Sequence, residues 1–506
     1  MDWMALKSGS DVRGVAVGED AVLTPNVAQA LGAAFVHMLC AHTGKAARSL
    51  SVSIGRDSRI SGPELLSAIA AGMAKAGANV LDFGLCTTPA MYMSILTEGF
   101  RVDGAIMVTA SHHPYRLNGL KFFEAKGGLP GEEITRLLQD GSTLSLDSLP
   151  GGGVISQKPF LSAYQKLLTD RIKAGLNAHV ERPLSGLHVV VDAGNGAGGF
   201  YADMLQGLGA RVDGSQFLEP DGMFPNHVPN PESEEAMASI SAAVKRVKAD
   251  VGVIFDADCD RAAIVDNTGR EINRNRLIAL ISAILLSEKP GLTIVTDSVT
   301  SSGLHQFITE RGGAHYRYKR GYRNVIDEAI RLNQAGIDCP LAIETSGHAA
   351  FKENHFLDDG MYLVTLLMVE AMKRKQAGKT LGSLIAGLRE PVESMEIRLK
   401  ITVPDFRAAG KAAIQQALDY AASAKDWHIA PDNREGIRIH FDLGGGFQNG
   451  WFLLRLSVHD PVLPLNVESD VPGGTRYMLE SLLKAVKDVP GIDVQPIREK
   501  LETLSS

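Results

Sequence analysis

The stretch Gly104-Ala-Ile-Met-Val-Thr-Ala-Ser-His-His-Pro114 joins a short apolar run to a polar loop. The run Gly104–Val108 has the length and composition of a buried β-strand. Loops at the carboxyl ends of parallel strands are where α/β proteins bind ligands. Ser111 is therefore a candidate nucleophile, although a serine hydroxyl needs a base, a metal ion or an attached phosphoryl group to react. A polar turn that ends at Pro114 is the alternative interpretation.

Apolar runs alternate with amphipathic helical stretches on both sides of this loop, through residue 390. Strands separated by helices predict βαβ units and mostly parallel sheets. A Ser/Gly-rich stretch at 141–153 indicates a first boundary, and after Pro391 the pattern changes to that of an antiparallel α+β unit. We therefore expect three similar α/β domains with mixed, mostly parallel sheets and a smaller C-terminal α+β domain. Their predicted bounds are 1–155, 156–275, 276–390 and 391–506.

The composition is that of an ordinary globular protein, with 45% apolar and 22% charged residues among 506. Basic residues total 51 and acidic residues 58, so no basic surplus exists and we expect no nucleic-acid partner. No apolar run reaches the roughly 18 residues of a membrane span, so we expect no membrane association. Four widely spaced cysteines and the absence of a secretory pattern at the start predict a cytoplasmic location. A cleaved organellar transit peptide would leave no trace in this chain.

A second polar loop, Asp256-Ala-Asp-Cys-Asp-Arg261, follows the apolar run Val251–Phe255. Carboxylates at positions i, i+2 and i+4 of an extended loop can converge on one hard cation, and oxygen ligands suit magnesium. Arg261 adds a fixed cation beside them. The EF-hand pattern fails, because its sixth position is Arg261 instead of Gly and its twelfth is Asn267 instead of Glu. We favour a metal site formed by Asp256, Asp258 and Asp260 over a solvated acidic turn.

Two further segments place polar groups where a ligand could meet them. Lys121 lies in the otherwise apolar segment Asn118-Gly-Leu-Lys-Phe122, so it either meets an anion in a pocket or lies on an exposed strand face. In Glu344-Thr-Ser-Gly-His348, three hydrogen-bonding side chains occupy alternate positions. Glu344, Ser346 and His348 suit sugar hydroxyls, which both donate and accept. A helix-capping turn is the alternative for Ser346.

A last polar segment, Arg455-Leu-Ser-Val-His-Asp-Pro461, follows a strand-like run at 451–454. Arg455 and Ser457, with His459 nearby, could hold a phosphate through charge-assisted hydrogen bonds. An arginine at the end of a strand is more often simply solvated.

The segment Gly194-Asn-Gly-Ala-Gly-Gly199 fits the G-x-G-x-x-G pattern of dinucleotide-binding proteins, and Asp213 stands where a ribose-binding acid would. Asp192, however, would place a negative charge beside the pyrophosphate. A nicotinamide enzyme also has no use for the Ser111 loop and the carboxylate triplet together. We favour a tight strand-to-helix turn that needs glycines for its geometry.

Taken together, these motifs resemble those of the α-D-phosphohexomutase superfamily, in particular its phosphomannomutase/phosphoglucomutase branch. The resemblance covers nearly the whole chain in the family's order of motifs. The loop 109–114 is similar to T-A-S-H-N-P, the loop 256–261 to D-G-D-x-D-R, and the loop 344–348 to G-E-x-S-G-H, with His113, Ala257 and Ile343 as departures. The segments Ser10-Asp-Val-Arg-Gly14 and Gly55-Arg-Asp-Ser-Arg59 resemble two more family motifs.

The resemblance implies four domains around a central cleft, with one loop from each. Ser111 would carry a phosphoryl group, and Asp256, Asp258 and Asp260 would hold Mg²⁺ with a phosphoserine oxygen as a further ligand. Arg13, Lys121 and His348 would serve proton transfer or charge stabilisation at the reacting hydroxyl. Glu344 and Ser346 would bind sugar hydroxyls, and Arg455 and Ser457 the non-reacting phosphate.

The implied reaction interconverts hexose 1-phosphate and hexose 6-phosphate, of glucose and/or mannose, through a bisphosphorylated sugar. A phosphoglucosamine mutase is the close alternative, and a non-catalytic sugar-phosphate binding protein is the alternative from another class. We expect a monomer or a homodimer whose partners are small hexose phosphates.

The last loop departs most from the family pattern R-P-S-N/G-T-E-P, because it lacks the Asn/Gly and Thr donors and has Pro464 where an arginine is usual. We expect His459 to substitute, so that phosphate affinity falls as this histidine deprotonates around pH 6–7.

Overall fold

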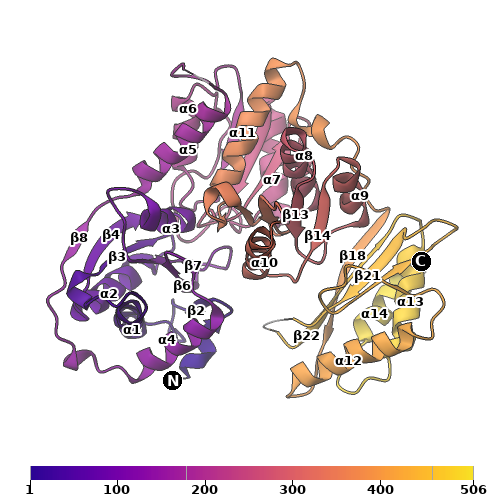
Figure 1. Cartoon of the computed structure of the whole chain (residues 1–506), viewed down its shortest axis with the longest axis horizontal. Helices are drawn as coiled ribbons and strands as arrows, with labels where there is room; N and C mark the ends of the chain where they lie inside the picture. Colours follow the sequence, from indigo (N-terminus) through magenta and orange to yellow (C-terminus); the bar gives the residue numbers. More distant parts are fainter. Residues whose placement is uncertain (1, 178, 458–459, 505–506) are drawn as a thin grey trace. The chain divides into compact units, whose positions relative to one another are not determined.

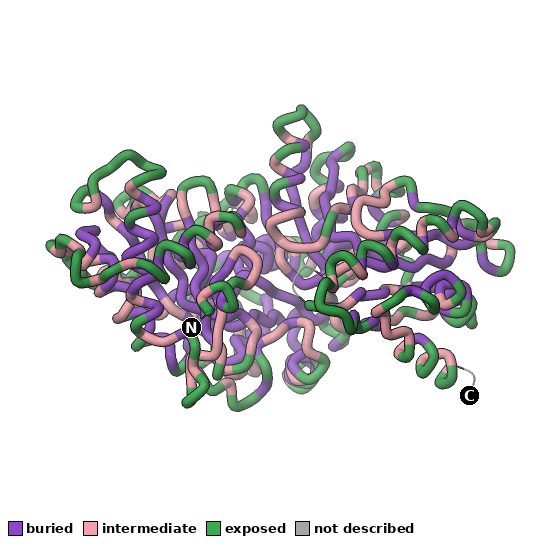
Figure 2. The backbone as a smooth tube through the Cα atoms, turned by 90° about the horizontal axis from the view of Figure 1, so that it is seen from below, coloured by how far each residue is buried: buried purple, intermediate pink, exposed green. Residues whose placement is uncertain are grey.

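The computed structural model describes residues 2–177, 179–457 and 460–504. The chain divides into two compact units, Met1–Asn273 with Ser346–Ser383, and Arg274–Thr345 with Leu384–Ser506. Buried stretches of backbone alternate with exposed turns throughout the described chain (Figure 2).

The first sheet of the first unit has the order β1-β2-β6-β5-β3-β4-β8, with β7 beside β6. Its central strands β5, β3, β4 and β8 run parallel, and β1, β2 and β6 join it antiparallel. The strands are β1 (Lys7–Ser8), β2 (Asp11–Val15), β3 (Ser51–Arg56), β4 (Asn79–Leu85), β5 (Gly104–Val108), β6 (Leu117–Glu124), β7 (Gly127–Gly128) and β8 (Ile155–Gln157). The predicted strand Gly104–Val108 is therefore confirmed as β5, and the Ser111 loop follows its carboxyl end.

Four helices pack around this sheet, α1 (Pro25–Thr43), α2 (Gly62–Lys75), α3 (Thr88–Leu96) and α4 (Gly131–Thr143) (Figure 1). Thr24 caps α1 by accepting from Val27 N, Pro25 opens it, and Gly44 ends it in a left-handed conformation. Helices α1 and α2 touch through their backbones, because a Cβ on Gly72 would lie 1.9 Å from the Gln29 carbonyl oxygen. A buried apolar cluster fills the space between these helices and the sheet.

The second sheet of this unit has the order β12-β11-β10-β9, with β9 and β10 parallel and the other pairs antiparallel. Its strands are β9 (Val189–Asp192), β10 (Val251–Phe255), β11 (Ala262–Asp266) and β12 (Glu271–Ile272). Helices α7 (Glu234–Val247) and α11 (Gly360–Gln376) pack on this sheet, and α5 (Leu161–Gly175) and α6 (Phe200–Gly207) lie nearby (Figure 1). The short strands β16 (Ala349–Phe351) and β17 (Leu357–Asp358) form an antiparallel pair.

The glycine-rich segment after β9 is a tight backbone turn. A Cβ on Gly196 would lie 2.6 Å from the Ala257 carbonyl oxygen, and one on Gly199 would lie 2.1 Å from that of Leu218. Asp192 Oδ1 accepts from Gly194 N at 2.9 Å. The missing side chain of Gly196 thus lets the turn pack closely against the 256–261 loop. A tight turn that needs glycines is the interpretation that the sequence favoured.

The second unit contains the parallel strands β14 (Ala314–Arg317), β13 (Thr293–Thr296) and β15 (Leu341–Ile343), with α8 (Asn275–Glu288), α9 (Ser302–Glu310) and α10 (Tyr322–Gln334). Its other sheet is antiparallel, in the order β18-β22-β21-β20-β19. These strands are β18 (Glu393–Lys400), β19 (His428–Ile429), β20 (Ile437–Phe441), β21 (Gly450–Leu454) and β22 (Val462–Ser469). Helices α12 (Phe406–Ala421), α13 (Gly474–Val486) and α14 (Gln495–Thr503) pack on it around an apolar cluster (Figure 1).

The predicted fold class is confirmed: mixed α/β sheets precede an α+β region that begins after Pro391. Within the described residues, no helix is both long enough and apolar enough to cross a membrane.

Candidate active site

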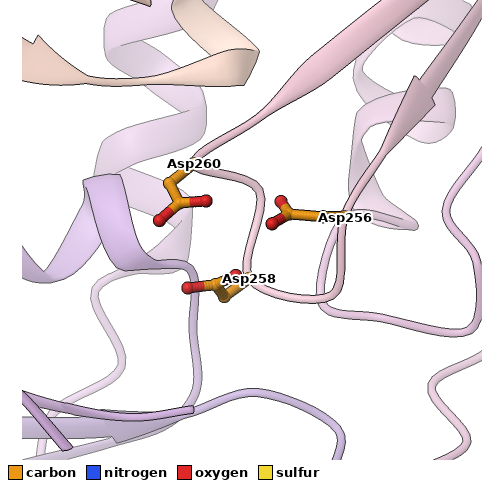
Figure 3. A group of neighbouring side chains, drawn as sticks. All are labelled: Asp256, Asp258 and Asp260. Atoms are coloured by element: carbon orange, nitrogen blue, oxygen red, sulfur yellow. The ribbon is translucent and has the colours of Figure 1, made fainter. Parts of the chain in front are cut away.

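The loop between β10 and β11 brings three carboxylates to one point (Figure 3). One carboxylate oxygen from each of Asp256, Asp258 and Asp260 lies within 4.8 Å of the others, and all three side chains are buried. Asp258 Oδ1 and Asp260 Oδ1 have no hydrogen-bond partner. A buried carboxylate oxygen without a partner is costly, so this donor set fits a hard metal cation.

The electrostatics of the three acids also favour a cation. Burial and repulsion from the neighbouring carboxylates raise the pKa of Asp256 well above its ordinary value and that of Asp258 to about 6. Burial acts in the same direction on Asp260, but the Lys121 ammonium outweighs it and holds the pKa of Asp260 below its ordinary value. A bound divalent cation would relieve the repulsion among these groups.

Ser111 lies at this carboxylate cluster, although it comes from a different sheet. Its hydroxyl donates to Asp256 Oδ2 at 2.8 Å, and Arg261 Nη2 donates to Ser111 Oγ at 3.0 Å. The side chain is buried, and the residue has a left-handed backbone with φ of +51°. A non-glycine residue in this region is strained and is held there by its surroundings. The predicted serine and the predicted metal loop therefore share one site.

Arg59 holds the Ser111 loop in this conformation through the backbone. Its guanidinium is fully buried, pairs with Asp57 at 3.1 Å, and donates to the carbonyls of Ser111, His113, Pro114 and Leu117. Asp57 in turn accepts from Thr109 Oγ1 at 2.7 Å. Arg59 was not predicted as a site residue. The only indication of its role in the sequence was its place in the family-like motif at 55–59.

Lys121 and His348 both lie against Asp260. Lys121 Nζ, on β6, donates to Asp260 Oδ2 at 2.6 Å, and His348 Nε2 is 3.7 Å from Asp260 Oδ1. The other ring nitrogen of His348 shares a hydrogen bond of 2.8 Å with Ser346 Oγ. Burial, helped by nearby cations, lowers the pKa of His348 to about 3, although Asp260 opposes the shift.

Arg13, on β2, contacts the Ser111 loop at His113. Its Nη1 lies 2.7 Å from His113 Nε2, and its Nη2 donates to Asp11 Oδ2 at 2.9 Å. Burial and the charges of Arg13, Arg59 and Arg261 lower the pKa of His113 to about 4. The imidazole is therefore neutral at pH 7 and accepts from Arg13. Arg261 and Arg59 thus contact Ser111, and Arg13 contacts its loop, an arrangement that favours the binding of a phosphorylated ligand.

Thr88 and Arg261 complete this part of the site, and neither was predicted as a site residue. Thr88, at the start of α3, donates to Asp258 Oδ2 at 2.5 Å. Arg261 pairs with Asp256 at 3.1 Å and lies 3.7 Å from Glu232. The proximity of Arg261 to the acids was expected, but its hydrogen bond to Ser111 was not.

The remaining predicted residues belong to the second unit. Glu344 Oε1 accepts from Gly321 N at 2.6 Å. Arg455 is buried, and burial lowers its pKa although Glu435 opposes the shift. Ser457 Oγ accepts from Asp460 N at 3.2 Å. His459 lies outside the described residues, so its role stays a prediction.

Comparison with known proteins shows which family the chain belongs to. The family models described as phosphoglucomutase/phosphomannomutase, alpha/beta/alpha domains I, II and III, match residues 5–143, 163–269 and 273–392. A phosphomannomutase/phosphoglucomutase of Pseudomonas putida is 34% identical over 441 residues, which cover 87% of this chain and 86% of that protein. A phosphoglucomutase of Neisseria gonorrhoeae is 30% identical over 480 residues, which cover 94% and 95%.

A solved structure has a similar fold. The phosphoglucomutase/phosphomannomutase family protein of Burkholderia thailandensis aligns with a TM-score of 0.77 and 29% identity, covering 96% of this chain and 99% of that one.

A buried serine hydroxyl beside three acids and several fixed cations defines an α/β enzyme that transfers phosphoryl groups. The chain belongs to the phosphoglucomutase/phosphomannomutase family, within the α-D-phosphohexomutase superfamily. It is thus an isomerase, a phosphohexomutase, as the motifs predicted.

Proposed function

We propose that this phosphohexomutase interconverts the 1-phosphates and 6-phosphates of glucose and mannose through phosphorylated Ser111 and a bisphosphorylated sugar. The observation that supports this most directly is the position of Ser111 Oγ, 2.8 Å from Asp256 Oδ2 and 3.0 Å from Arg261 Nη2. The name of the Pseudomonas relative supports both sugars, and that of the Neisseria relative supports glucose.

We assign Asp256, Asp258 and Asp260 to Mg²⁺, together with an oxygen on phosphorylated Ser111. When bound, this ion would withdraw charge from the phosphoryl oxygens and make Ser111 a better leaving group. Mg²⁺ fits because all the donors are oxygens and the unpartnered ones are buried.

In the proposed transfer, a sugar hydroxyl oxygen attacks the phosphorus of phosphorylated Ser111. The new O–P bond forms as the bond from phosphorus to Ser111 Oγ breaks. The proton of the sugar hydroxyl passes to the neutral imidazole of His348, and Ser111 Oγ takes up a proton as it leaves. Arg261 Nη2 stabilises the charge that develops on Ser111 Oγ. We assign Arg13, Lys121 and His348 to the reacting hydroxyl and its proton.

The second half of the cycle reverses these steps with the other phosphate of the bisphosphorylated sugar. That phosphate returns to Ser111, so one site must hold a phosphate at either end of the sugar. We assign Glu344 and Ser346 to the sugar hydroxyls, and Arg455 and Ser457, with His459, to the non-reacting phosphate. Arg455 is buried, and a desolvated guanidinium is well suited to bind phosphate.

The predicted domain bounds, at residues 155, 275 and 390, remain part of the proposal, as do a cytoplasmic location and a monomeric or homodimeric state. Phosphoglucosamine mutase remains the alternative to test.

A substrate panel tests the proposal. Glucose, mannose and glucosamine 1-phosphates are supplied with Mg²⁺ and a trace of the matching bisphosphate, and formation of the 6-phosphate is followed. We expect turnover of glucose and mannose 1-phosphates that is lost in Ser111→Ala and kept in Ser142→Ala, an exposed serine on α4. Turnover of glucosamine 1-phosphate alone would assign the alternative mutase, and no turnover of glucose or mannose 1-phosphate would contradict the proposed substrates.

A further inference from the structure

Arg13 reaches the Ser111 loop by crossing a neighbouring strand. In the first sheet, β6 lies between β2, which carries Arg13, and β5, which the Ser111 loop follows. Adjacent strands lie about 4.8 Å apart, so β2 and β5 are about 10 Å from each other. Arginine is long enough to cross this gap, but an ordered side chain of this length needs a contact at its far end to offset the entropy that it loses.

The crossing point is a glycine of β6. Gly119 is the partner of Arg13 in the β2–β6 pair, and a Cβ on Gly119 would lie 3.0 Å from Arg13 Cγ. The same Cβ would lie 2.8 Å from the carbonyl oxygen of Thr109, at the start of the Ser111 loop. The missing side chain therefore leaves room for the stem of Arg13 to pass over β6 toward the loop.

His113 holds the far end of Arg13. Its Nε2 lies 2.7 Å from Arg13 Nη1, and Asp11 on β2 accepts from Arg13 Nη2 at 2.9 Å. Because a guanidinium only donates, Nε2 of His113 accepts and its Nδ1 carries the proton. One anchor of the guanidinium thus belongs to the strand that carries Arg13, and the other belongs to the loop that carries Ser111.

The loop in turn fixes His113. The backbone N of His113 donates to the Ala110 carbonyl at 3.1 Å, and its carbonyl accepts from Arg59 Nη2 at 2.7 Å. Its ring stacks on that of His112, with the centroids 4.5 Å apart and an angle of 27° between the planes. A side chain that is already ordered loses little entropy when it binds Arg13, so His113 is a rigid anchor.

This anchor is a departure from the family pattern. The motif T-A-S-H-N-P has asparagine at the position of His113 in this chain. The polar atoms of asparagine lie closer to the backbone than the Nε2 of an imidazole does. An asparagine here would therefore fall short of Arg13 in the position that the structure shows.

We propose that His113 is a positioning residue for the transfer, which keeps the Arg13 guanidinium at the Ser111 loop where the sugar hydroxyl attacks. This inference rests on the proposed function, which assigns Arg13 to the reacting hydroxyl. Phosphoryl transfer depends mainly on positioning and charge stabilisation, so a guanidinium that is free to turn away lowers the rate of the chemical step. Other groups bind the sugar phosphate, so KM should change little.

A double-mutant cycle with glucose 1-phosphate tests this role. We expect His113→Leu to lower kcat about tenfold, the scale for losing one hydrogen bond to a charged group, with little change in KM. His113→Gln keeps an acceptor of similar reach and should retain most of the wild-type kcat. In an Arg13→Met background, His113→Leu should have almost no further effect, because its effect passes through Arg13. His37→Leu, at an exposed histidine of α1, is the matched control and should keep the wild-type kcat.

A second measurement does not depend on turnover. In nitrogen-15 NMR spectra of the full chain with labelled histidine at pH 7, the resonances that vanish in His113→Gln belong to His113. We expect them to show a proton on Nδ1, because Nε2 accepts from Arg13. In Arg13→Met the proton should move toward Nε2, the position that a neutral histidine side chain favours in water.

Three results would overturn the inference and leave the proposed function intact. They are a wild-type kcat in His113→Leu, an equal loss of kcat in the wild-type and Arg13→Met backgrounds, and a proton on Nε2 of His113 in the wild type. A wild-type chain that turns over neither glucose nor mannose 1-phosphate would contradict the proposed function instead. The proton position on His113 would then still decide whether this side chain holds Arg13.

Discussion

The hydroxyl of Ser111 donates a 2.8 Å hydrogen bond to Asp256 Oδ2, although 145 residues separate the two along the chain. Each residue lies just beyond the carboxyl end of a buried strand, β5 for Ser111 and β10 for Asp256. The group that would carry phosphate and the group that would hold the metal are thus in direct contact.

Arg261 is the cation closest to the leaving oxygen, since its Nη2 lies 3.0 Å from Ser111 Oγ. We expect Arg261→Lys to lower kcat about 10²–10³-fold, as the loss of one positioned donor does at other charge-stabilising sites. The measurement is steady-state kinetics with glucose 1-phosphate. Arg211→Lys, at an exposed arginine of the same unit, is the matched control and should keep its rate. A fall of less than threefold in Arg261→Lys would contradict the assigned role.

Arg59 fixes the Ser111 loop by donating to four backbone carbonyls while paired with Asp57. A lysine cannot reach all these acceptors, so buried carbonyls lose their donors in Arg59→Lys. We expect the free energy of unfolding to fall by about 3 kcal/mol, because each buried carbonyl left without a donor costs about 1–3 kcal/mol. Urea unfolding measures this change, and Arg101→Lys, at an exposed position, should be neutral. Equal stabilities of the two variants would show that the contacts to the loop are unimportant.

The environment of His227 predicts that the free energy of unfolding depends on pH. Its Nε2 lies 3.1 Å from both Asp192 oxygens, and although burial lowers its pKa, the hydrogen bond and charge of Asp192 outweigh burial and raise it above 6.5. A raised pKa in the folded state stabilises the protein below the unfolded value, and this contribution is lost as pH rises through the folded value.

We therefore expect the urea midpoint of the wild type to fall as pH increases from about 6.5 upward, over the range in which His227 loses its proton. His227→Gln keeps a donor near Asp192 but cannot titrate, so its midpoint should change less over the same range. If the urea midpoints of the two proteins changed equally with pH, His227 would not be the source of the pH dependence.

Metal removal should affect stability as well as activity, because three buried carboxylates repel one another without a cation. We expect EDTA to abolish turnover and Mg²⁺ to restore it. Mg²⁺ at 100 times its dissociation constant should add about 2.7 kcal/mol to the free energy of unfolding. Asp260→Asn should weaken this stabilisation by Mg²⁺, and Asp203→Asn, on the exposed side of α6, should not. Identical stability with EDTA and with Mg²⁺ would contradict a metal site.

The sequence was most informative where a polar loop follows a buried strand. Ser111 and the acids of the 256–261 loop could be predicted, because side chains at strand ends are functional in α/β folds and three acids in a short loop need a cation. The role of Arg59 could not be predicted, since its partners are backbone carbonyls and these leave no pattern in a sequence. The glycines at 194–199 fit a dinucleotide motif, and only their backbone contact with Ala257 shows what they do.

The central claim is that Ser111 accepts and returns the phosphoryl group, and intact-protein mass spectrometry tests it most directly. After incubation with glucose 1,6-bisphosphate and Mg²⁺, we predict a species heavier by one phosphoryl group, localised to Ser111 by peptide mapping and discharged by added glucose 1-phosphate. Ser111→Ala should show no such species, and Ser142→Ala should show it in full. A phosphoryl group found on another residue, or one on Ser111 that glucose and mannose phosphates cannot remove, would contradict the account.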